Sequence, residues 1–481
     1  MNKPIRRLAV FAMALFGVLL LNVTYIQAIQ AEDLQTHPFN ARQFADRMVQ
    51  PRGPIIIGGE KVAYSKKIKN DDKYQRHYEN GQNYGHVTGA FTPIGATGLE
   101  KADNALLNGS DDRLVVRNFL DMLTGKEQQG ASLELTIQPK AQQAAIDGLG
   151  ATGKRGAAVA LDPTTGAVLA SASLPSYDPS DISSVTNDKE RAANFERLEK
   201  DESRPMVNRA FSETYFPGST FKIVTAAAAL ENGASPDSTQ EAPDELTLPQ
   251  GGTLPNAGGG SCNGGSPDTL SHSIEMSCNT SMANWAISLG EGKMEEQAKK
   301  FGFNTPGLKI PTDIATSKYP TGLNGSQLGQ TGIGQFDVRA TPLQMAMVAG
   351  AVANGGDVMK PYLVEEAKAP DLSRIEKGGG ETLTSAVSSG TADSLKEMMI
   401  GVTEGADASG PNAKIPGMQV AGKTGTAETG EGANSHNWFI SFAPADDPQV
   451  AVAVVVENGN ASGGEVAAPI AKSMMEAVIT Q

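Results

Sequence analysis

The chain has 481 residues, and its 40 Lys plus Arg against 54 Asp plus Glu give a formal net charge of −14, which argues against a nucleic-acid partner because polyanions are bound by basic surfaces. Two cysteines exclude a disulfide-rich scaffold, and because neither belongs to a C-x-x-C pair they also argue against a structural zinc site. With 39% hydrophobic and 20% charged residues, the composition is that of a folded chain rather than a disordered one.

The first predicted element is an apolar segment at the N-terminus. Leu8 to Leu21 is an unbroken apolar run, and with its extension to Ile29 it is about long enough to span the hydrocarbon of a membrane. Three basic residues precede the run, so the positive-inside rule predicts a cytoplasmic N-terminus and an extracytoplasmic remainder. A cleaved signal peptide is the alternative, but no clear A-x-A site follows. We expect residues 1–30 to form a single-pass signal anchor that contacts the lipid of the cell membrane.

Residues 31–130 are predicted to form a small, non-catalytic N-terminal module. Residues 30–130 carry 13 acidic and 13 basic side chains, so the net negative charge resides beyond them and the composition changes near residue 130. Within this module, residues 112–124 show helical periodicity. We find no motif there that carries chemistry.

The order of elements beyond residue 130 predicts one sheet with helices packed on it. A helix is expected over 138–149, and a long helical insertion separates an early pair of strands from three later ones. The expected strands are 156–162, 166–173, 419–427, 438–443 and 449–457, with a closing helix over 467–479. Residues 131–481 therefore predict an α/β (α+β) domain with a five-stranded antiparallel sheet.

The segment F-P-G-S-T-F-K contains the first motif that carries chemistry, an S-x-x-K. Pro217 and Gly218 break the chain, Ser219 begins a helix, and Lys222 follows one turn later on the same face. A serine needs a base to become a nucleophile, and Lys222 can serve when burial or a second cation favours its neutral form. The N–H groups at this helix start would stabilise an oxyanion beside Ser219. A serine N-cap with a solvated lysine is the commoner explanation of an isolated S-x-x-K.

An S-x-N motif, Ser277-Cys278-Asn279, follows in or beside a helix-like stretch over 270–289. A hydroxyl and a carboxamide two residues apart can relay a proton and hold a substrate amide. Taken alone, the triplet is also ordinary turn chemistry.

A K-T-G motif lies in the strand predicted over 419–427. Gly425 weakens a strand unless another backbone approaches closely, and an extended peptide substrate would supply that backbone. Lys423 and the hydroxyls of Thr424 and Thr426 could meet the carboxylate of that peptide. A Walker phosphate loop does not fit, because that loop opens a helix and no helical pattern follows this lysine.

The three motifs occur in the order S-x-x-K, S-x-N and K-T-G, about 55 and 145 residues apart, which is the set known from penicillin-binding proteins and class A β-lactamases. With them, the chain resembles a class B penicillin-binding protein, a monofunctional peptidoglycan D,D-transpeptidase, and most closely the penicillin-binding protein A type. Arg52-Gly53 resembles the family's membrane-proximal motif but lacks the aspartate expected downstream of it. The other matching segments are Gly98-Leu99-Glu100, Leu107-Asn108-Gly109, Leu135-Thr136-Ile137-Gln138, Asn208-Arg209-Ala210, Gly332-Ile333-Gly334-Gln335, Thr341-Pro342-Leu343-Gln344 and Trp438-Phe439.

The resemblance implies a role for each motif residue. Ser219 would attack the bond between two terminal D-alanines of a peptidoglycan stem peptide, with Lys222 as base and Ser277 and Lys423 passing the proton to the leaving D-alanine. Asn279 would bind the donor's side amide, and Thr424, Gly425 and Thr426 would line the site of the terminal carboxylate or of a β-lactam antibiotic. The backbone N–H groups of Ser219 and Thr426 would form the oxyanion hole. The resemblance implies no cofactor and no metal, and it suggests proteins of cell-wall synthesis or division as partners.

Three other functions are weighed against transpeptidation. A class A β-lactamase needs a glutamate-activated water, and no E-x-x-L-N segment follows Ser277. A D,D-carboxypeptidase uses the same residues and remains the enzymatic alternative. The non-enzymatic alternative is a membrane-anchored cell-wall scaffold whose motifs are relics.

The two cysteines form a candidate disulfide. Cys262 ends the glycine-rich stretch 251–265, which is expected to be a mobile loop, and Cys278 lies inside the S-x-N motif. The predicted location outside the cytoplasm permits oxidation, so we expect a bond between them that restrains Ser277 and Asn279. The alternative is two independent small packing residues.

Overall fold

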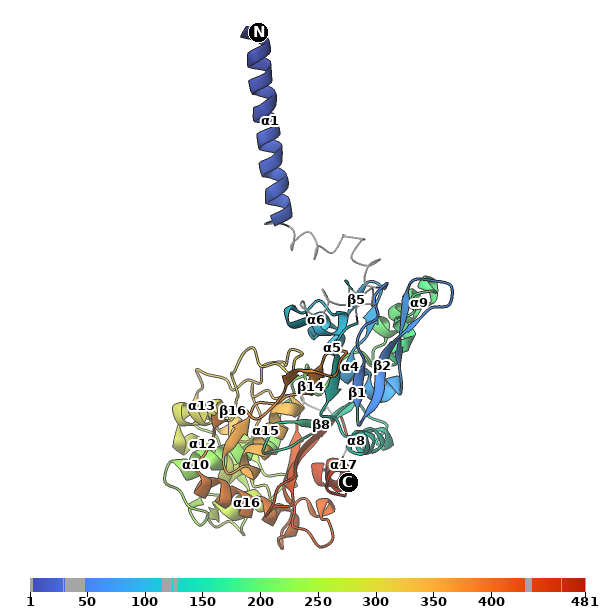
Figure 1. The fold of residues 1–481 in the computed structure, drawn as a ribbon. Helices are drawn as coiled ribbons and strands as arrows, with labels where there is room; N and C mark the ends of the chain where they lie inside the picture. The colour runs from blue at the N-terminus through green and yellow to red at the C-terminus, as the bar shows by residue number, and fades with distance from the viewer. Residues whose placement is uncertain are drawn as a thin grey trace.

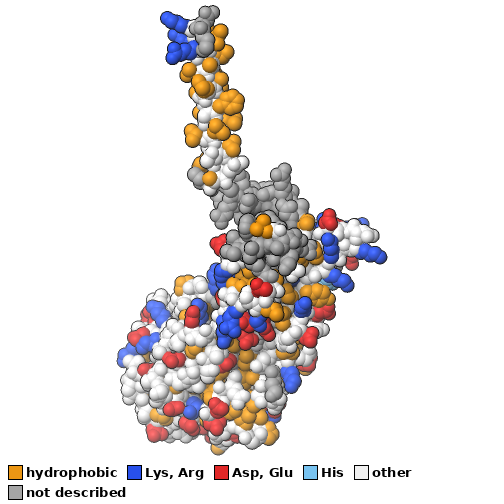
Figure 2. Space-filling view, in the orientation of Figure 1, with side chains coloured by type: hydrophobic (Ala, Val, Ile, Leu, Met, Phe, Trp, Pro, Cys, Tyr) orange, Lys and Arg blue, Asp and Glu red, His pale blue; other side chains and the backbone are white. Residues whose placement is uncertain are grey.

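A computed structural model describes residues 3–28, 30, 48–114, 123, 129–428, 435–459 and 461–480. Helix α1 (Lys3–Ala28) stands apart from the folded body and buries none of its side chains (Figure 1). Its apolar side chains cover most of its length, with basic side chains at its start (Figure 2). Among the described residues it is the one helix long and apolar enough to cross a membrane, which supports the predicted anchor.

The N-terminal part of the body is built on a six-stranded sheet in the order β15-β14-β6-β1-β2-β3. Strand β1 pairs parallel with β6, and the other neighbours are antiparallel. The strands are β1 (Ile55–Ile57), β2 (Glu60–Lys67), β3 (Tyr74–Tyr78), β6 (Ser132–Leu135), β14 (Val364–Lys368) and β15 (Arg374–Lys377). Three of them come from beyond residue 130, so this sheet joins the N-terminal module to the rest of the chain.

Short helices pack beside this sheet. They are α4 (Gly81–Thr88), α5 (Gly98–Ala102) and α6 (Asn104–Asn108). Helix α9 (Asp188–Lys200), from later in the chain, packs on the 3₁₀ turn η2 (Pro179–Ile182), which contacts β3. Of the helix predicted over 112–124, the structure describes a 3₁₀ turn, η1 (Asp112–Leu114), and most of the remainder lies outside the described residues.

A buried ion triad ties the first strands to α5. Glu100 is fully buried, and its carboxylate accepts hydrogen bonds from Arg52 Nε at 2.9 Å and Arg76 Nε at 2.6 Å. Burial acts to raise the pKa of Glu100, but the two guanidinium groups and their hydrogen bonds hold that pKa below its usual value. Arg52, which the sequence leaves without a downstream aspartate, thus has its carboxylate partner in Glu100.

Glu100→Gln is expected to lower the free energy of unfolding by about 3 to 5 kcal/mol, because it leaves two buried guanidinium groups without a charge partner. Chemical denaturation of the purified protein measures this. The matched control is Glu376→Gln, which breaks the exposed Arg113–Glu376 pair and should cost less than about 1 kcal/mol. Equal losses in the two variants would contradict a special role for the triad.

The second sheet has five strands in the order β17-β18-β19-β7-β8, and every neighbouring pair is antiparallel. The strands are β7 (Gly156–Leu161), β8 (Val168–Leu174), β17 (Ala421–Ala427), β18 (His436–Ala443) and β19 (Val450–Val456). The predicted α/β class and five-stranded sheet are confirmed. Helices α8 (Pro139–Ala151) and α17 (Gly463–Ile479) cover one face and α15 (Pro342–Ala353) the other. Strand β19 is buried along its whole length, which explains its unbroken apolar sequence.

The insertion between β8 and β17 is helical, as predicted, and lies beside the sheet (Figure 1). The helix-like stretch 270–289 is two helices, α11 (Leu270–Glu275) and α12 (Asn279–Leu289). Ser277 lies between them with φ 70°, a left-handed conformation that ends the first helix. The insertion also contains α10 (Lys222–Glu231), α13 (Glu291–Lys300), α14 (Gly325–Thr331), α16 (Ser389–Glu404) and the hairpin β10 (Glu245–Thr247) to β11 (Thr253–Pro255).

Candidate active site

Ser219 lies half-buried in a tight turn that precedes α10. The turn is a 3₁₀ helix, η3 (Gly218–Phe221), and Lys222 follows it directly as the first residue of α10. Gly218 has φ 55°, and a Cβ there would come within 2.6 Å of the carbonyl oxygen of Thr426. The Gly218 N–H donates to the carbonyl of Gly334 at 3.0 Å. The turn is therefore held between β17 and the G-I-G-Q segment.

Lys222 is fully buried and joins the first motif to the second. Its Nζ donates to the carbonyl oxygen of Ser277 and to Oδ1 of Asn279, both at 2.7 Å, and lies 3.3 Å from Ser277 Oγ. Burial, reinforced by the charge of Lys423, holds the pKa of Lys222 well below its usual value. Ser277, whose backbone is in the left-handed conformation, thus accepts a hydrogen bond from Lys222 through its carbonyl oxygen.

Lys423 reaches the same serine from the sheet. It lies on the edge strand β17 and is fully buried, and its Nζ donates to Ser277 Oγ at 2.8 Å and to the carbonyl of Thr424 at 3.1 Å. Burial lowers the pKa of Lys423 to about 7. The Ser277 hydroxyl oxygen therefore faces two amines, which leaves its own O–H free to donate to another group.

The K-T-G glycine is explained by the protein's own packing. A Cβ on Gly425 would come within 2.8 Å of Trp438 Cβ, 2.9 Å of Thr220 Cγ2 and 3.1 Å of the Pro217 carbonyl. The expectation that a substrate backbone explains this glycine is therefore wrong: the turn that contains Ser219 packs against it. Strand β17 is still an edge strand, so its outer side is available for an extended peptide.

The two threonines of this motif differ in access. Thr426 is exposed, whereas Thr424 is buried and its Oγ1 lies 3.0 Å from Ser409 Oγ. Ser409 also donates to the carbonyl of Glu275 at 3.0 Å. The sequence reasoning missed Ser409, because it belongs to no motif and reaches the site from a segment next to α16.

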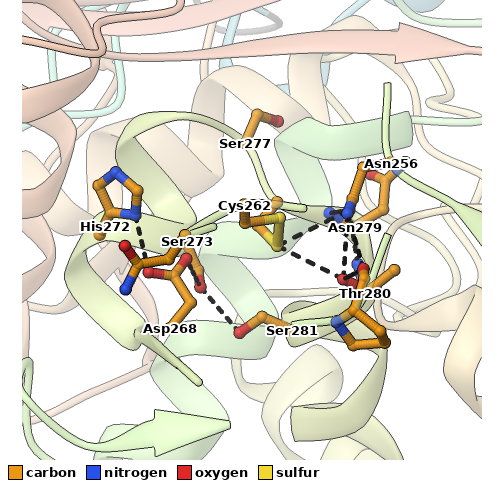
Figure 3. Close-up of a disulfide and its surroundings, with 12 residues drawn as sticks. Asn256, Cys262, Asp268, His272, Ser273, Ser277, Asn279, Thr280 and Ser281 are labelled. Atoms are coloured by element: carbon orange, nitrogen blue, oxygen red, sulfur yellow. Dashed lines mark hydrogen bonds and ion pairs between the residues drawn. A yellow bond between two sulfur atoms is a disulfide. The ribbon is translucent and has the colours of Figure 1, made fainter. Parts of the chain in front are cut away.

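Cys262 and Cys278 are joined in a disulfide, with Cα atoms 5.8 Å apart (Figure 3). Asp268 lies within 4.8 Å of the sulfur atoms, a grouping that could in principle hold a metal. The two sulfur atoms form a disulfide, so neither is a thiolate that could bind a metal. The Asp268 carboxylate is instead hydrogen-bonded to His272 Nδ1 and Ser273 Oγ. The grouping of these three residues therefore needs no metal to explain it.

The glycine-rich stretch 251–265 contains more regular structure than a loop alone. It contains strand β11, the buried side chains of Asn256 and Cys262, and the disulfide. All seven of its glycines have positive φ, so the composition reflects a series of tight turns.

The arrangement brings the three motifs into one site: a half-buried serine, two buried lysines with lowered pKa, and a serine hydroxyl bonded to both amines. A family model described as the penicillin binding protein transpeptidase domain matches residues 156–476, and one described as the penicillin binding protein A dimerisation domain matches residues 52–133. The chain belongs to the class B penicillin-binding proteins, of the penicillin-binding protein A type.

Curated relatives match over the full length. This class B penicillin-binding protein is 42% identical to the peptidoglycan D,D-transpeptidase PbpA of Mycolicibacterium smegmatis, covering 100% of both chains. It is 41% identical to PbpA of Mycobacterium tuberculosis strain H37Rv, covering 100% of this chain and 99% of the relative.

Two solved structures of a relative have the same fold over most of the chain. The ceftriaxone acyl-enzyme complex of penicillin-binding protein A from M. tuberculosis has a TM-score of 0.87 at 39% identity, covering 90% of this chain and 99% of the other. The corresponding imipenem acyl-enzyme complex has a TM-score of 0.86 at 40% identity, with the same coverage.

Proposed function

We propose that this penicillin-binding protein is a peptidoglycan D,D-transpeptidase in which Ser219 is the nucleophile and Lys222 its general base. The observation that carries these roles is the shared serine: the amines of Lys222 and Lys423 both contact the Ser277 hydroxyl, at 3.3 and 2.8 Å. These contacts link the amine of Lys222, whose pKa is held well below its usual value one turn after Ser219, to a chain of hydrogen bonds that can move a proton.

Acylation begins when Ser219 Oγ attacks the carbonyl between the two terminal D-alanines of the donor stem peptide. Its proton passes to the neutral Nζ of Lys222, whose low pKa keeps it able to accept one. The backbone N–H groups of Ser219 and Thr426 stabilise the resulting oxyanion, and each such donor contributes about 2.7 to 4 kcal/mol. The close approach of Gly218 to the Thr426 carbonyl supports this pairing of turn and strand.

Collapse of the tetrahedral intermediate expels the amine of D-alanine, which needs a proton. The Ser277 hydroxyl donates it and recovers a proton from the ammonium of Lys423 or Lys222, so the relay is balanced. The hydroxyl of the exposed Thr426 and the charge of Lys423 hold the terminal carboxylate. Thr424 is buried beneath this site and contributes to it through its contact with Ser409. A β-lactam enters by the same route.

The donor's side amide is met by Asn279. Its Oδ1 is occupied by Lys222 and one of its N–H groups by the Pro255 carbonyl at 3.0 Å. The half-buried side chain therefore has one N–H left for a ligand. An amine from a neighbouring strand then attacks the acyl-enzyme and forms the cross-link.

The apolar helix α1 serves as the membrane anchor, and the three basic residues before its apolar run place its start in the cytoplasm. The body then lies outside the cell membrane, where peptidoglycan is built and where the disulfide is stable. The functional division of the chain is an anchor over residues 1–30, a non-catalytic module over 31–130 and the transpeptidase domain over 131–481. The partners of this protein are other proteins of cell-wall synthesis or division.

The test supplies the purified chain with a donor peptide ending in D-Ala-D-Ala and with an acceptor amine, and separates the products. Transpeptidation predicts release of D-alanine together with a cross-linked peptide whose yield rises with acceptor concentration. Release without cross-linked product would identify a D,D-carboxypeptidase. No release, with no labelling by penicillin, would identify a scaffold.

A further inference from the structure

We propose that Asn256 is a positioning residue for the reaction, acting through the S-x-N motif. Asn256 follows strand β11 in the glycine-rich stretch, lies in none of the three motifs, and is only 8% exposed. Its side chain lies beside Asn279 and Thr280 at the start of helix α12 (Figure 3). It also contacts the backbone of Pro243 and Gly260. The inference rests on the proposed function, because it concerns how that site is held in place.

The first contact is a cap supplied from outside the helix. Asn256 Oδ1 accepts from the backbone N–H of Asn279 at 2.9 Å and of Thr280 at 3.0 Å, the first two residues of α12. The first N–H groups of a helix have no partner within it. The N-cap residue Cys278 makes no side-chain cap because its sulfur is in the disulfide. Asn256 therefore does what an N-cap side chain ordinarily does.

The second contact fixes the amide itself. Asn256 Nδ2 lies 3.0 Å from the carbonyl oxygens of Pro243 and Gly260 and 3.2 Å from Thr280 Oγ1. With two N–H donors facing Oδ1 and three oxygen atoms around Nδ2, only one orientation of the amide fits. The Asn256 side chain is thus fixed by the backbone at Pro243 and Gly260, and from this position it holds the start of α12.

The consequence reaches the catalytic amine. Asn279 is the first residue of α12, and its Oδ1 is one of the oxygens that hold Lys222. Pro255, the residue before Asn256, also holds the Asn279 side chain, because its carbonyl oxygen accepts a hydrogen bond from Asn279 Nδ2. A shift of the helix start would move this oxygen and the neighbouring Ser277 away from Lys222. A displacement of about 1 Å at a reacting group costs about 10²-fold in rate.

The experiment measures acylation by a reporter penicillin as a function of its concentration, which separates the limiting acylation rate from the preceding binding constant. Asn256→Ala should lower the limiting rate by about 10²-fold. Asn256→Asp keeps an oxygen for the two N–H groups but turns a second oxygen toward the carbonyl oxygens of Pro243 and Gly260, so its rate should fall between those of the Ala variant and the parent. The matched control is Asn263→Ala, an exposed asparagine of the same stretch, which should leave the rate unchanged.

Two results would overturn the proposal. One is an Asn256→Ala protein that is folded and acylates within twofold of the parent. The other is an equal loss in the Ala and Asp variants that follows their loss of thermal stability. If Asn256→Ala does not fold, hydrogen exchange on the parent decides: the amides of Asn279 and Thr280 should be protected, and exchange as fast as in an exposed loop would end the idea. A parent that is not acylated at all would instead refute the proposed function.

Discussion

Ser219→Ala is expected to abolish covalent labelling of the protein by a reporter penicillin. Removal of the hydroxyl leaves no atom to form the ester, and loss of a serine nucleophile in an acyl-transfer enzyme costs about 10⁶-fold in rate. The half-buried Ser219 hydroxyl contributes little to packing, so the variant should fold as the parent does. Labelling followed by gel fluorescence and intact mass measures the outcome.

The control for this variant is Ser212→Ala, which removes an exposed hydroxyl seven residues earlier. It should label at the rate of the parent. A Ser219→Ala protein that still gains the mass of the penicillin would show that another residue is acylated, and the assignment of the nucleophile would be wrong.

Lys222→Met is expected to lower the acylation rate by about 10²- to 10⁴-fold, the usual contribution of a positioned general base. Methionine fills a similar volume without an amine, so the variant tests chemistry rather than packing. Lys293→Met, at an exposed lysine of α13, is the control and should leave the rate unchanged. A rate within tenfold of the parent would mean that another group takes the proton from Ser219.

The pH dependence of the same reaction tests the protonation state of Lys222. Only the neutral amine accepts a proton, so the acylation rate of the parent should rise as pH rises through the pKa of Lys222. Because burial and the charge of Lys423 lower this pKa, the rise should be complete well below the range of an ordinary lysine. In Lys222→Met this rising limb should be absent. A parent whose rate rises only at strongly alkaline pH would contradict a base that is neutral at physiological pH.

Much of the catalytic sheet could be predicted from sequence because its strands are locally unambiguous. The run that becomes β19 is apolar at every position, and the turn-rich segment before it separates it from β18. The three motifs could be found in the same way, since each is a short pattern with a fixed order along the chain.

Other features depend on residues far apart in sequence. Strands β14 and β6 pair although about 230 residues separate them, and no local pattern marks either as part of the N-terminal sheet. Glu100 becomes the partner of Arg52 only once α5 packs beside the first strands. The motifs also gave no sign of Asn256, because an asparagine in a glycine-rich stretch is typical of a turn.

The sequence by itself determined the apolar N-terminal helix, the α/β class and the three motifs, because apolar runs, strand periodicity and short motifs are properties of neighbouring residues. Only the tertiary structure decided that Ser277 stands between two buried lysines, that Gly425 accommodates the turn that contains Ser219, and that Asn256 caps α12 from another segment. The physical reason is that a lysine becomes a base through desolvation and nearby charge, and both arise only when distant segments of the chain close over it.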